Sequence, residues 1–83
     1  MMRINYESWW RERHPKYPHT MLTEVLDPCK VQAFLPGVEF ISAAVLTEDR
    51  PTMRIWGFKC VPDLRKFDDL LKTQVELLRL TVK

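Results

Sequence analysis

The fold is decided by residues 37–83, which read GVEFISAAVLTEDRPTMRIWGFKCVPDLRKFDDLLKTQVELLRLTVK. Two apolar segments, Val38–Thr47 and Thr52–Val61, are joined by a short polar turn and followed by one long amphipathic segment. Apolar runs separated by a turn are typical of a hairpin, and the apolar stripe that follows has helical spacing. The stretch therefore predicts an α+β fold: a small antiparallel sheet of two or three strands packed against a long C-terminal helix.

The two predicted strands differ in the pattern of their side chains. Val38–Thr47 is apolar at both alternate sets of positions, which predicts a central strand. In Thr52–Val61, Met53, Ile55 and Val61 fall on one side. The other side holds Arg54, Trp56, Phe58 and Cys60. Gly57 interrupts this strand and indicates a bulge or the close approach of another backbone.

The last predicted helix opens with Pro62 and Asp63, where an acidic residue complements the positive end of the helix dipole. Its apolar stripe consists of Leu64, Phe67, Leu71, Val75 and Leu78, widened by Leu70, Leu77 and Leu80. About twenty residues of helix would extend roughly 30 Å, enough to cross a small sheet. Only one face of the sheet can lie against this helix, so the other face must meet the N-terminal segment, a partner or solvent.

Two segments before the hairpin allow both helix and strand. Thr20–Leu26 favours a helical turn through its i, i+4 apolar pairs, with an edge strand as the alternative. Cys29–Leu35 is either a helix opened by Pro28, which would bury Val31, Phe34 and Leu35, or a strand that turns at Pro36-Gly37. The strand alternative gives a three-stranded meander, and the helix alternative leaves a two-stranded ribbon that needs more cover.

The N-terminal segment predicts a short helix over Asn5–His14. Asn5 is a suitable N-cap, Ile4 and Trp9 match a hydrophobic staple, and Pro15 stops the helix. Helical spacing places an aromatic and basic face on one side: Tyr6, Trp9, Trp10 and Arg13. A helix of about ten residues is marginal in water, so this face must dock on something.

Composition bounds the class of protein. The 83 residues, with 46% hydrophobic and 29% charged side chains, suit one globular domain over residues 1–83. The longest nearly apolar run, residues 40–46, is far shorter than the roughly 20 residues of a membrane-spanning helix. No apolar stretch follows the first charge, which argues against a signal peptide and predicts a cytoplasmic protein. The two cysteines, Cys29 and Cys60, are too few for a disulfide framework, so we expect reduced, buried thiols.

The aromatic and basic N-terminal segment is the main candidate for function, because the whole net charge of +2 lies in the first twenty residues. Aromatic side chains beside arginines are typical of protein interfaces and of single-stranded nucleic-acid sites. The predicted contact residues are Trp9, Trp10, Arg11, Arg13 and Tyr17, with Arg54 and Trp56 as a continuation across the sheet. The alternative is that Trp9 and Trp10 close the core.

The interpretation is a small binding domain that acts on a protein partner of unknown identity, as an adaptor or inhibitor. Single-stranded nucleic acid is the alternative partner, although +2 is a weak charge for a phosphate binder. A homo-oligomer is also possible, since a second copy could bury an uncovered apolar face.

Catalysis and metal binding have little support in the sequence. The spacings of His14, His19, Cys29 and Cys60 match no zinc pattern. If a helix begins at Pro28, the Cys29 thiol would lie in its first turn beside Lys30, where its pKa would fall. A nucleophile also needs a base, and no histidine is tied to Cys29 by sequence. We therefore expect no enzyme, no cofactor and no metal.

Overall fold

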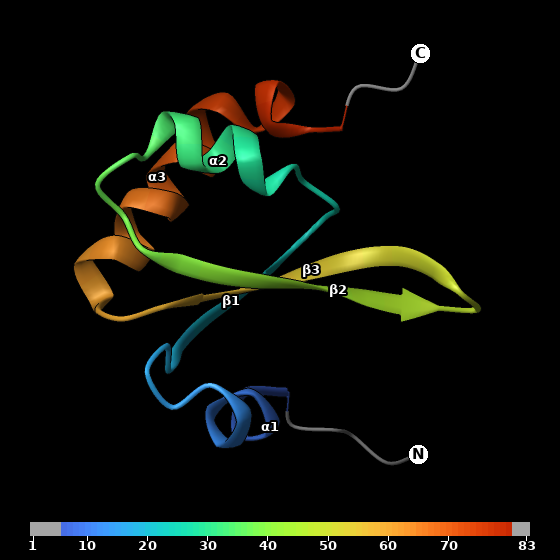
Figure 1. Cartoon of the computed structure of the whole chain (residues 1–83). Helices are drawn as coiled ribbons and strands as arrows, with labels where there is room; N and C mark the ends of the chain where they lie inside the picture. Colours follow the sequence, from blue (N-terminus) through green and yellow to red (C-terminus); the bar gives the residue numbers. More distant parts are fainter. Residues whose placement is uncertain (1–5, 81–83) are drawn as a thin grey trace.

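The computed structural model describes residues 6–80 and shows an α+β fold in which helices lie on both faces of one sheet (Figure 1). The elements in chain order are α1 (Tyr6–Arg13), β1 (His19–Thr23), α2 (Pro28–Phe34), β2 (Phe40–Thr47), β3 (Arg50–Phe58) and α3 (Val61–Leu78). The predicted N-terminal helix, hairpin and long C-terminal helix are confirmed. The expected cap at Asn5 and staple at Ile4 lie outside the described residues.

The sheet is antiparallel, and its strand order is β1-β3-β2. The prediction that the Val38–Thr47 strand is central is therefore wrong, because β3 is central and β2 is an edge. Apolar residues on both faces of a strand predict that both faces are covered by other elements. They do not predict whether the strand has a neighbouring strand on each side. In fact the side chains of β2 are half-buried or exposed.

The third strand is formed by residues for which the sequence pattern favours a helical turn. Residues His19–Thr23 form β1, so the helical prediction for Thr20–Leu26 is wrong and its edge-strand alternative is right. Met21 pairs with Trp56 and Leu22 with Ile55 in the register of β1 and β3. Pairing with residues 54–58 of β3 supplies this short segment with backbone hydrogen bonds that an isolated helical turn could not equal.

The segment after Pro28 forms helix α2, so the helical alternative for Cys29–Leu35 is correct. The Asp27 side chain accepts a hydrogen bond from the backbone N–H of Cys29 at 2.9 Å, and Pro28 occupies the first turn. This is the arrangement expected of an N-cap. Val31 is fully buried as predicted, but Phe34 is 43% exposed although the helical alternative placed it in the core.

The β2–β3 hairpin closes through a two-residue turn at Glu48 and Asp49, because Thr47 pairs directly with Arg50. Both turn residues have left-handed backbone, with φ of 52° and 64°. This is the turn geometry that matches the twist of a hairpin, and it normally selects Asn-Gly. A register shift between Val45 and Leu46 places Pro51 opposite Leu46.

Replacing Asp49 with glycine is expected to raise the free energy of unfolding by about 0.5 to 1 kcal/mol, because glycine adopts a positive φ without the steric cost of a Cβ atom. Urea unfolding followed by circular dichroism measures the change. Asp49→Ala is the control, since it removes the same charge but keeps the Cβ atom. An equal gain from both variants would assign the effect to charge and not to backbone strain.

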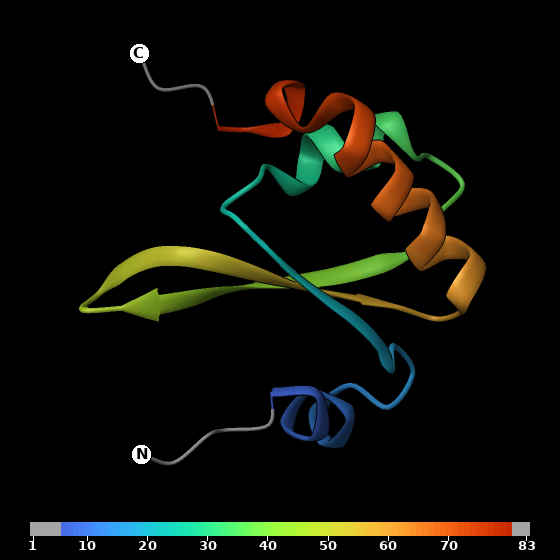
Figure 2. The same ribbon diagram turned by 180° about the vertical axis from the view of Figure 1, so that it is seen from behind.

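One face of the sheet is covered by α2 and α3 (Figures 1 and 2). The core on this face consists of Leu26, Val31, Val38, Trp56, Phe58, Phe67, Leu70 and Leu78. The Phe67 ring lies 4.8 Å from the ring of Trp56 and 5.2 Å from that of Phe58, measured between centroids. The predicted stripe of α3 is confirmed at its centre. Leu77 and Leu80 are exposed instead, and α3 bends at Gln74, whose φ is −134°.

The opposite face of the sheet is covered by α1 (Figure 2). Trp10 is 1% exposed, and its indole lies on Gly57 of β3. The prediction of a bulge or of another backbone at Gly57 is therefore wrong: the group that approaches closely is the Trp10 side chain, and the strand pairing has no bulge there. The indole N–H donates to the carbonyl oxygen of Tyr17 at 2.9 Å, which ties α1 to the segment that leads into β1.

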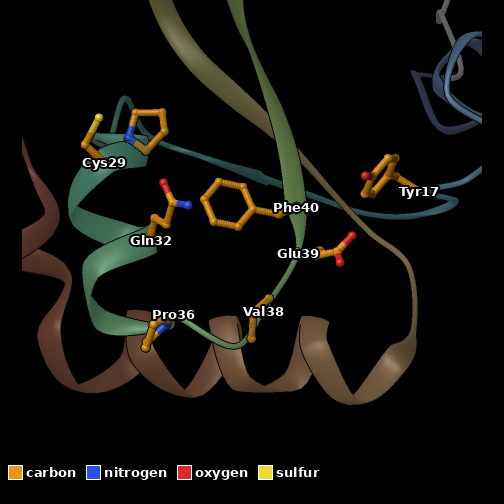
Figure 3. Close-up of a pocket in the computed structure, with 8 residues that line it drawn as sticks. Tyr17, Cys29, Gln32, Pro36, Val38, Glu39 and Phe40 are labelled. Atoms are coloured by element: carbon orange, nitrogen blue, oxygen red, sulfur yellow. The ribbon is translucent and has the colours of Figure 1, made fainter.

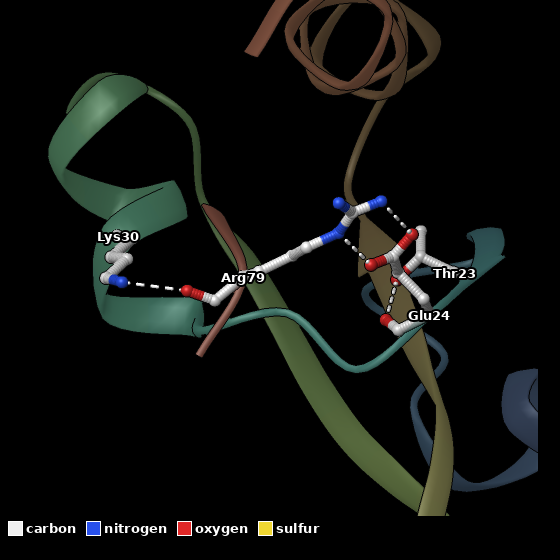
Figure 4. Close-up of polar contacts among 4 residues, drawn as sticks. All are labelled: Thr23, Glu24, Lys30 and Arg79. Atoms are coloured by element: carbon white, nitrogen blue, oxygen red, sulfur yellow. Dashed lines mark hydrogen bonds and ion pairs between the residues drawn. The ribbon is translucent and has the colours of Figure 1, made fainter. Parts of the chain in front are cut away.

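The end of α3 is tied to the end of β1 and the start of α2 (Figure 4). Arg79 Nε donates to Glu24 Oε1 at 2.6 Å, and this hydrogen bond holds the pKa of Glu24 below its ordinary value. The carbonyl oxygen of Arg79 accepts from Lys30 Nζ at 2.8 Å. The backbone N–H of Asp27 donates to the carbonyl oxygen of Leu78 at 2.8 Å. None of the helices within residues 6–80 is long and apolar enough to cross a membrane.

Candidate functional site

An apolar groove lies between α1 and the sheet, on the face opposite α3. Its volume is about 350 Å³, and we call it the α1 groove. The residues that line it are Tyr6, Trp9, Leu22, Ala43, Ala44, Val45, Met53 and Ile55. Trp9 is 41% exposed and Met53 is 38% exposed, so the groove opens to solvent with two large apolar side chains at its rim.

The alternation of the strands explains the floor of this groove. Ala43 pairs with Ile55, and Val45 pairs with Met53, so these side chains share one face of the sheet. Leu22 joins them because it pairs with Ile55 from the other side. An alanine at position 43 leaves space above the sheet that a larger residue would fill. Trp9 and Tyr6, three residues apart on α1, form the wall.

Arg13 adds a charge beside the groove. Its guanidinium carbon lies 4.7 Å from the centroid of the Trp9 ring, one turn away on α1. Within residues 6–80 no carboxylate is paired with Arg13, whereas Arg11 lies 3.5 Å from the Glu7 carboxylate and also donates to the carbonyl oxygen of Pro18. Arg13 is thus the arginine of α1 whose donors face solvent, and it stands next to an exposed indole.

Two of the residues predicted for the contact surface belong to the interior. Trp10 is buried against Gly57, and Trp56 is fully buried on the other face of the sheet. The Trp56 indole N–H donates to the Thr23 hydroxyl oxygen at 2.7 Å, so its polar group is satisfied inside the protein. For these two tryptophans the structure corrects the expectation of a contact role, because neither side chain reaches the surface.

The remaining predicted residues do not form one surface. Arg54 lies on the face of Trp56, with its guanidinium carbon 5.8 Å from the centroid of that ring, and so on the opposite side from the α1 groove. Its Nε atom is buried without a hydrogen-bond partner in the part of the chain that the structure describes. Tyr17 is half-buried, and Lys59 Nζ lies 5.7 Å from its ring centroid. The structure brings together Trp9 and Arg13, with Arg11 on the same helix.

Sequence reasoning missed the sheet side of the groove. Leu22, Val45 and Met53 were not among the predicted contact residues, yet they line it. One signal was available: Met53 and Ile55 alternate with Trp56 and Phe58, so the face that the long helix does not cover is also apolar. The pairing partners on β1 and β2 follow only from the register of the sheet.

A second hollow, about 310 Å³ in volume, lies beside the start of β2, and we call it the β2 hollow (Figure 3). Its lining residues are Tyr17, Pro28, Cys29, Gln32, Pro36, Val38, Glu39 and Phe40. Figure 3 shows Cys29 and Glu39 on opposite sides of Phe40. Glu39 is engaged by Lys59 Nζ at 2.5 Å, a hydrogen bond that raises the pKa of Lys59. Among residues 6–80, no histidine lines this hollow.

Both thiols, Cys29 and Cys60, are exposed and unpaired, which corrects the expectation that they are buried. Cys29 lies in the first turn of α2 as predicted, and Cys60 is the residue before α3. Across residues 6–80 no three metal-ligating side chains come together. The His14 ring instead packs at a tilt against Trp10, with 4.4 Å between centroids.

Comparison of the chain with models of protein families, with curated proteins and with solved structures finds no match.

Proposed function

We propose that this domain is a non-enzymatic protein-binding module, an adaptor or inhibitor, that takes an apolar side chain of its partner into the α1 groove. The observation that carries the proposal is the half-exposed Trp9 indole at the rim of an apolar groove, with the Arg13 guanidinium 4.7 Å from its ring centroid. Tryptophan and arginine are the residues that most often dominate binding energy at protein interfaces.

The size of the groove limits what it can accept. A volume of about 350 Å³ accommodates one or two large apolar side chains and not a whole helix. The floor of alanine, valine and isoleucine offers no hydrogen-bonding side chain, so the anchor itself should be aliphatic or aromatic. Met53 at the rim can change rotamer and adapt to different anchors.

Arg13 defines the second feature of the partner. A guanidinium that stacks on an indole keeps its donors in the plane where a carboxylate can accept two hydrogen bonds. Because Arg13 has no carboxylate partner in residues 6–80, we expect the partner to bring an acidic residue. The proposed ligand is therefore a protein segment with an apolar anchor and a neighbouring Asp or Glu.

Replacing Trp9 with alanine is expected to weaken partner binding by about 30-fold or more, because truncation of a central hot-spot residue commonly costs about 2 kcal/mol. Phe34→Ala is the matched control, since Phe34 is an aromatic of almost equal exposure on α2, at 43% against 41% for Trp9. Peptides selected by display against the intact chain would serve as ligands, and calorimetry would give both affinities. Equal losses for the two variants would assign the binding to general surface hydrophobicity.

Trp9 also gives a direct optical readout of the site. Trp10 and Trp56 are buried, so acrylamide should quench mainly Trp9 in the folded chain. A ligand in the α1 groove should protect Trp9 from the quencher, and Trp9→Phe should remove that signal. Selected peptides that bind without protecting Trp9 would place the interface elsewhere and contradict the proposal.

The same quenching experiment also tests whether the partner is a nucleic acid. A single-stranded oligonucleotide that protects Trp9, with an affinity that falls steeply as salt rises, would replace the protein partner. Binding of an apolar, acidic peptide should instead depend only modestly on salt, because Arg13 contributes one ion pair.

A further inference from the structure

The outer edge of β2 is open along its whole length. The strand Phe40–Thr47 pairs with β3 on one side, and in the described chain no strand pairs with its other side. Its eight residues, FISAAVLT, include no charge, no proline and no glycine. Natural edge strands usually carry such residues, because an unprotected edge is a template for pairing with another chain. This edge is therefore an unprotected template for pairing with another strand.

The residues of this edge are arranged with near two-fold symmetry in size. On either side of Ala43 stand two small residues, Ser42 and Ala44. Beyond these stand two β-branched residues, Ile41 and Val45, and then two large apolar residues, Phe40 and Leu46. A strand that pairs antiparallel with a copy of itself places residues at equal distances from the centre opposite each other. The size pattern therefore matches self-pairing about Ala43.

We propose that β2 pairs with β2 of a second copy of this chain, antiparallel and with Ala43 opposite the partner's Ala43. The two sheets then join into one continuous antiparallel sheet. The symmetry axis passes midway between the two Ala43 residues and is perpendicular to the sheet, as in an isologous dimer. Such an axis keeps the faces in register, so α1 of both copies lies on one side and the α2–α3 layers lie on the other.

The side chains that meet in this register are complementary. Ile41 faces Val45 of the other copy, a β-branched pair of the kind that stabilises adjacent strands. Leu46, which is 61% exposed, faces Phe40 on the opposite copy, beside the β2 hollow. No charged side chain lies within residues 40–46, so like charges do not meet across the axis. Exposed apolar surface on each copy is covered by the other.

This inference does not depend on the proposed function, although Ala43, Ala44 and Val45 of β2 contribute both to the groove and to the edge. The α1 groove lies over the sheet face, whereas self-pairing uses the backbone at the edge. In the dimer the two α1 grooves open on the same side of the sheet, one on each side of the axis. A failure of peptide binding in the groove would leave the dimer intact, and a monomeric chain could still bind a peptide.

The size of the contact predicts a weak dimer. One strand pair with its flanking side chains falls in the range of small, transient interfaces, well below a standard interface of about 800 Å² per partner. We expect monomers at low micromolar concentration and dimers at several hundred micromolar. Sedimentation of the intact chain across this range measures the change in mass. A chain that stays monomeric throughout overturns the proposal and leaves the edge to a strand of another protein.

Spin labels test the register. In a chain with Cys29→Ser and Cys60→Ser, a nitroxide on a cysteine introduced as Ile41→Cys, Ala43→Cys or Val45→Cys reports its distance to the same position in the other copy. Dipolar broadening should be strongest at position 43. It should fall equally at positions 41 and 45, where the two labels are separated by roughly 13 Å along the strand. A maximum at 41 or 45 contradicts pairing about Ala43.

Hydrogen exchange on the unlabelled chain provides a second measurement that needs no substitution. The amides of β2 that point away from β3 should exchange several-fold more slowly as concentration rises, while those of α1 and α3 stay unchanged. Protection that rises elsewhere but not in β2 would identify a different interface and overturn the proposal.

Discussion

Replacing Trp10 with alanine is expected to lower the free energy of unfolding by about 3 to 5 kcal/mol, the usual cost of truncating a fully buried aromatic side chain. The indole is 1% exposed, lies against Gly57, and gives its N–H to the carbonyl oxygen of Tyr17. Its loss removes the main anchor of α1. Since a chain of this length has a total stability of roughly 4 to 8 kcal/mol, the variant should be largely unfolded or close to it.

Trp9→Ala is the matched control for this experiment, because Trp9 is the adjacent residue on the same helix and is 41% exposed. We expect it to change the stability by less than about 1 kcal/mol. Urea unfolding followed by far-ultraviolet circular dichroism compares the two. If the Trp10→Ala variant stays folded and only loses partner binding, Trp10 is a contact residue and not a core residue.

Gly57→Ala is expected to lower the free energy of unfolding by roughly 2 to 3 kcal/mol, at the upper end of the range for overpacking. A Cβ atom at this position would lie 2.6 Å from the indole Nε1 atom of Trp10 and 2.7 Å from Cζ2. Gly57 lies in the central strand, paired with Thr20 on one side and Ile41 on the other, so its backbone cannot withdraw. The indole, and α1 with it, must move.

Gly37→Ala separates this clash from the general effect of replacing glycine. A Cβ atom at Gly37 would meet nothing within 4 Å, so this change should be neutral or stabilise by up to about 1 kcal/mol. A double-mutant cycle with Trp10→Ala completes the test. Without the indole, Gly57→Ala should cost less than about 1 kcal/mol, and an unchanged cost would show that the clash is not its cause.

The hairpin and the long helix could be predicted from sequence because their signals are local. Alternation in β3 correctly separates Met53 and Ile55 from Trp56 and Phe58, and the stripe of α3 correctly includes Phe67 and Leu70. These patterns depend only on which residues are apolar and at what spacing. The same locality explains the errors. The apolar pattern does not distinguish an edge strand from a central one. The segment Thr20–Leu26 is also too short for its pattern to distinguish a helical turn from a strand.

The candidate site depended on a distinction that the sequence could not make. Trp9 and Trp10 are neighbours, and successive residues of a helix point about 100° apart. One of them faces the sheet and the other faces solvent, but composition alone does not say which. The deciding contact is that of Trp10 with Gly57, forty-seven positions away in the chain, where only a glycine leaves room for the ring. Arg13 then follows Trp9 to the surface because it lies one turn further along α1.

The docking of α1 through a single large side chain has a thermodynamic consequence for recognition. The α1 groove has one wall from a short helix and a floor from the sheet, so it exists only while α1 is docked. Any ligand that fills it binds the docked state alone and shifts the docking equilibrium toward that state. The intrinsic affinity of the groove is correspondingly reduced by the fraction of molecules in which α1 is undocked. In the proposed binding mode, residues at the Trp10–Gly57 contact would therefore change the affinity for a ligand without touching it.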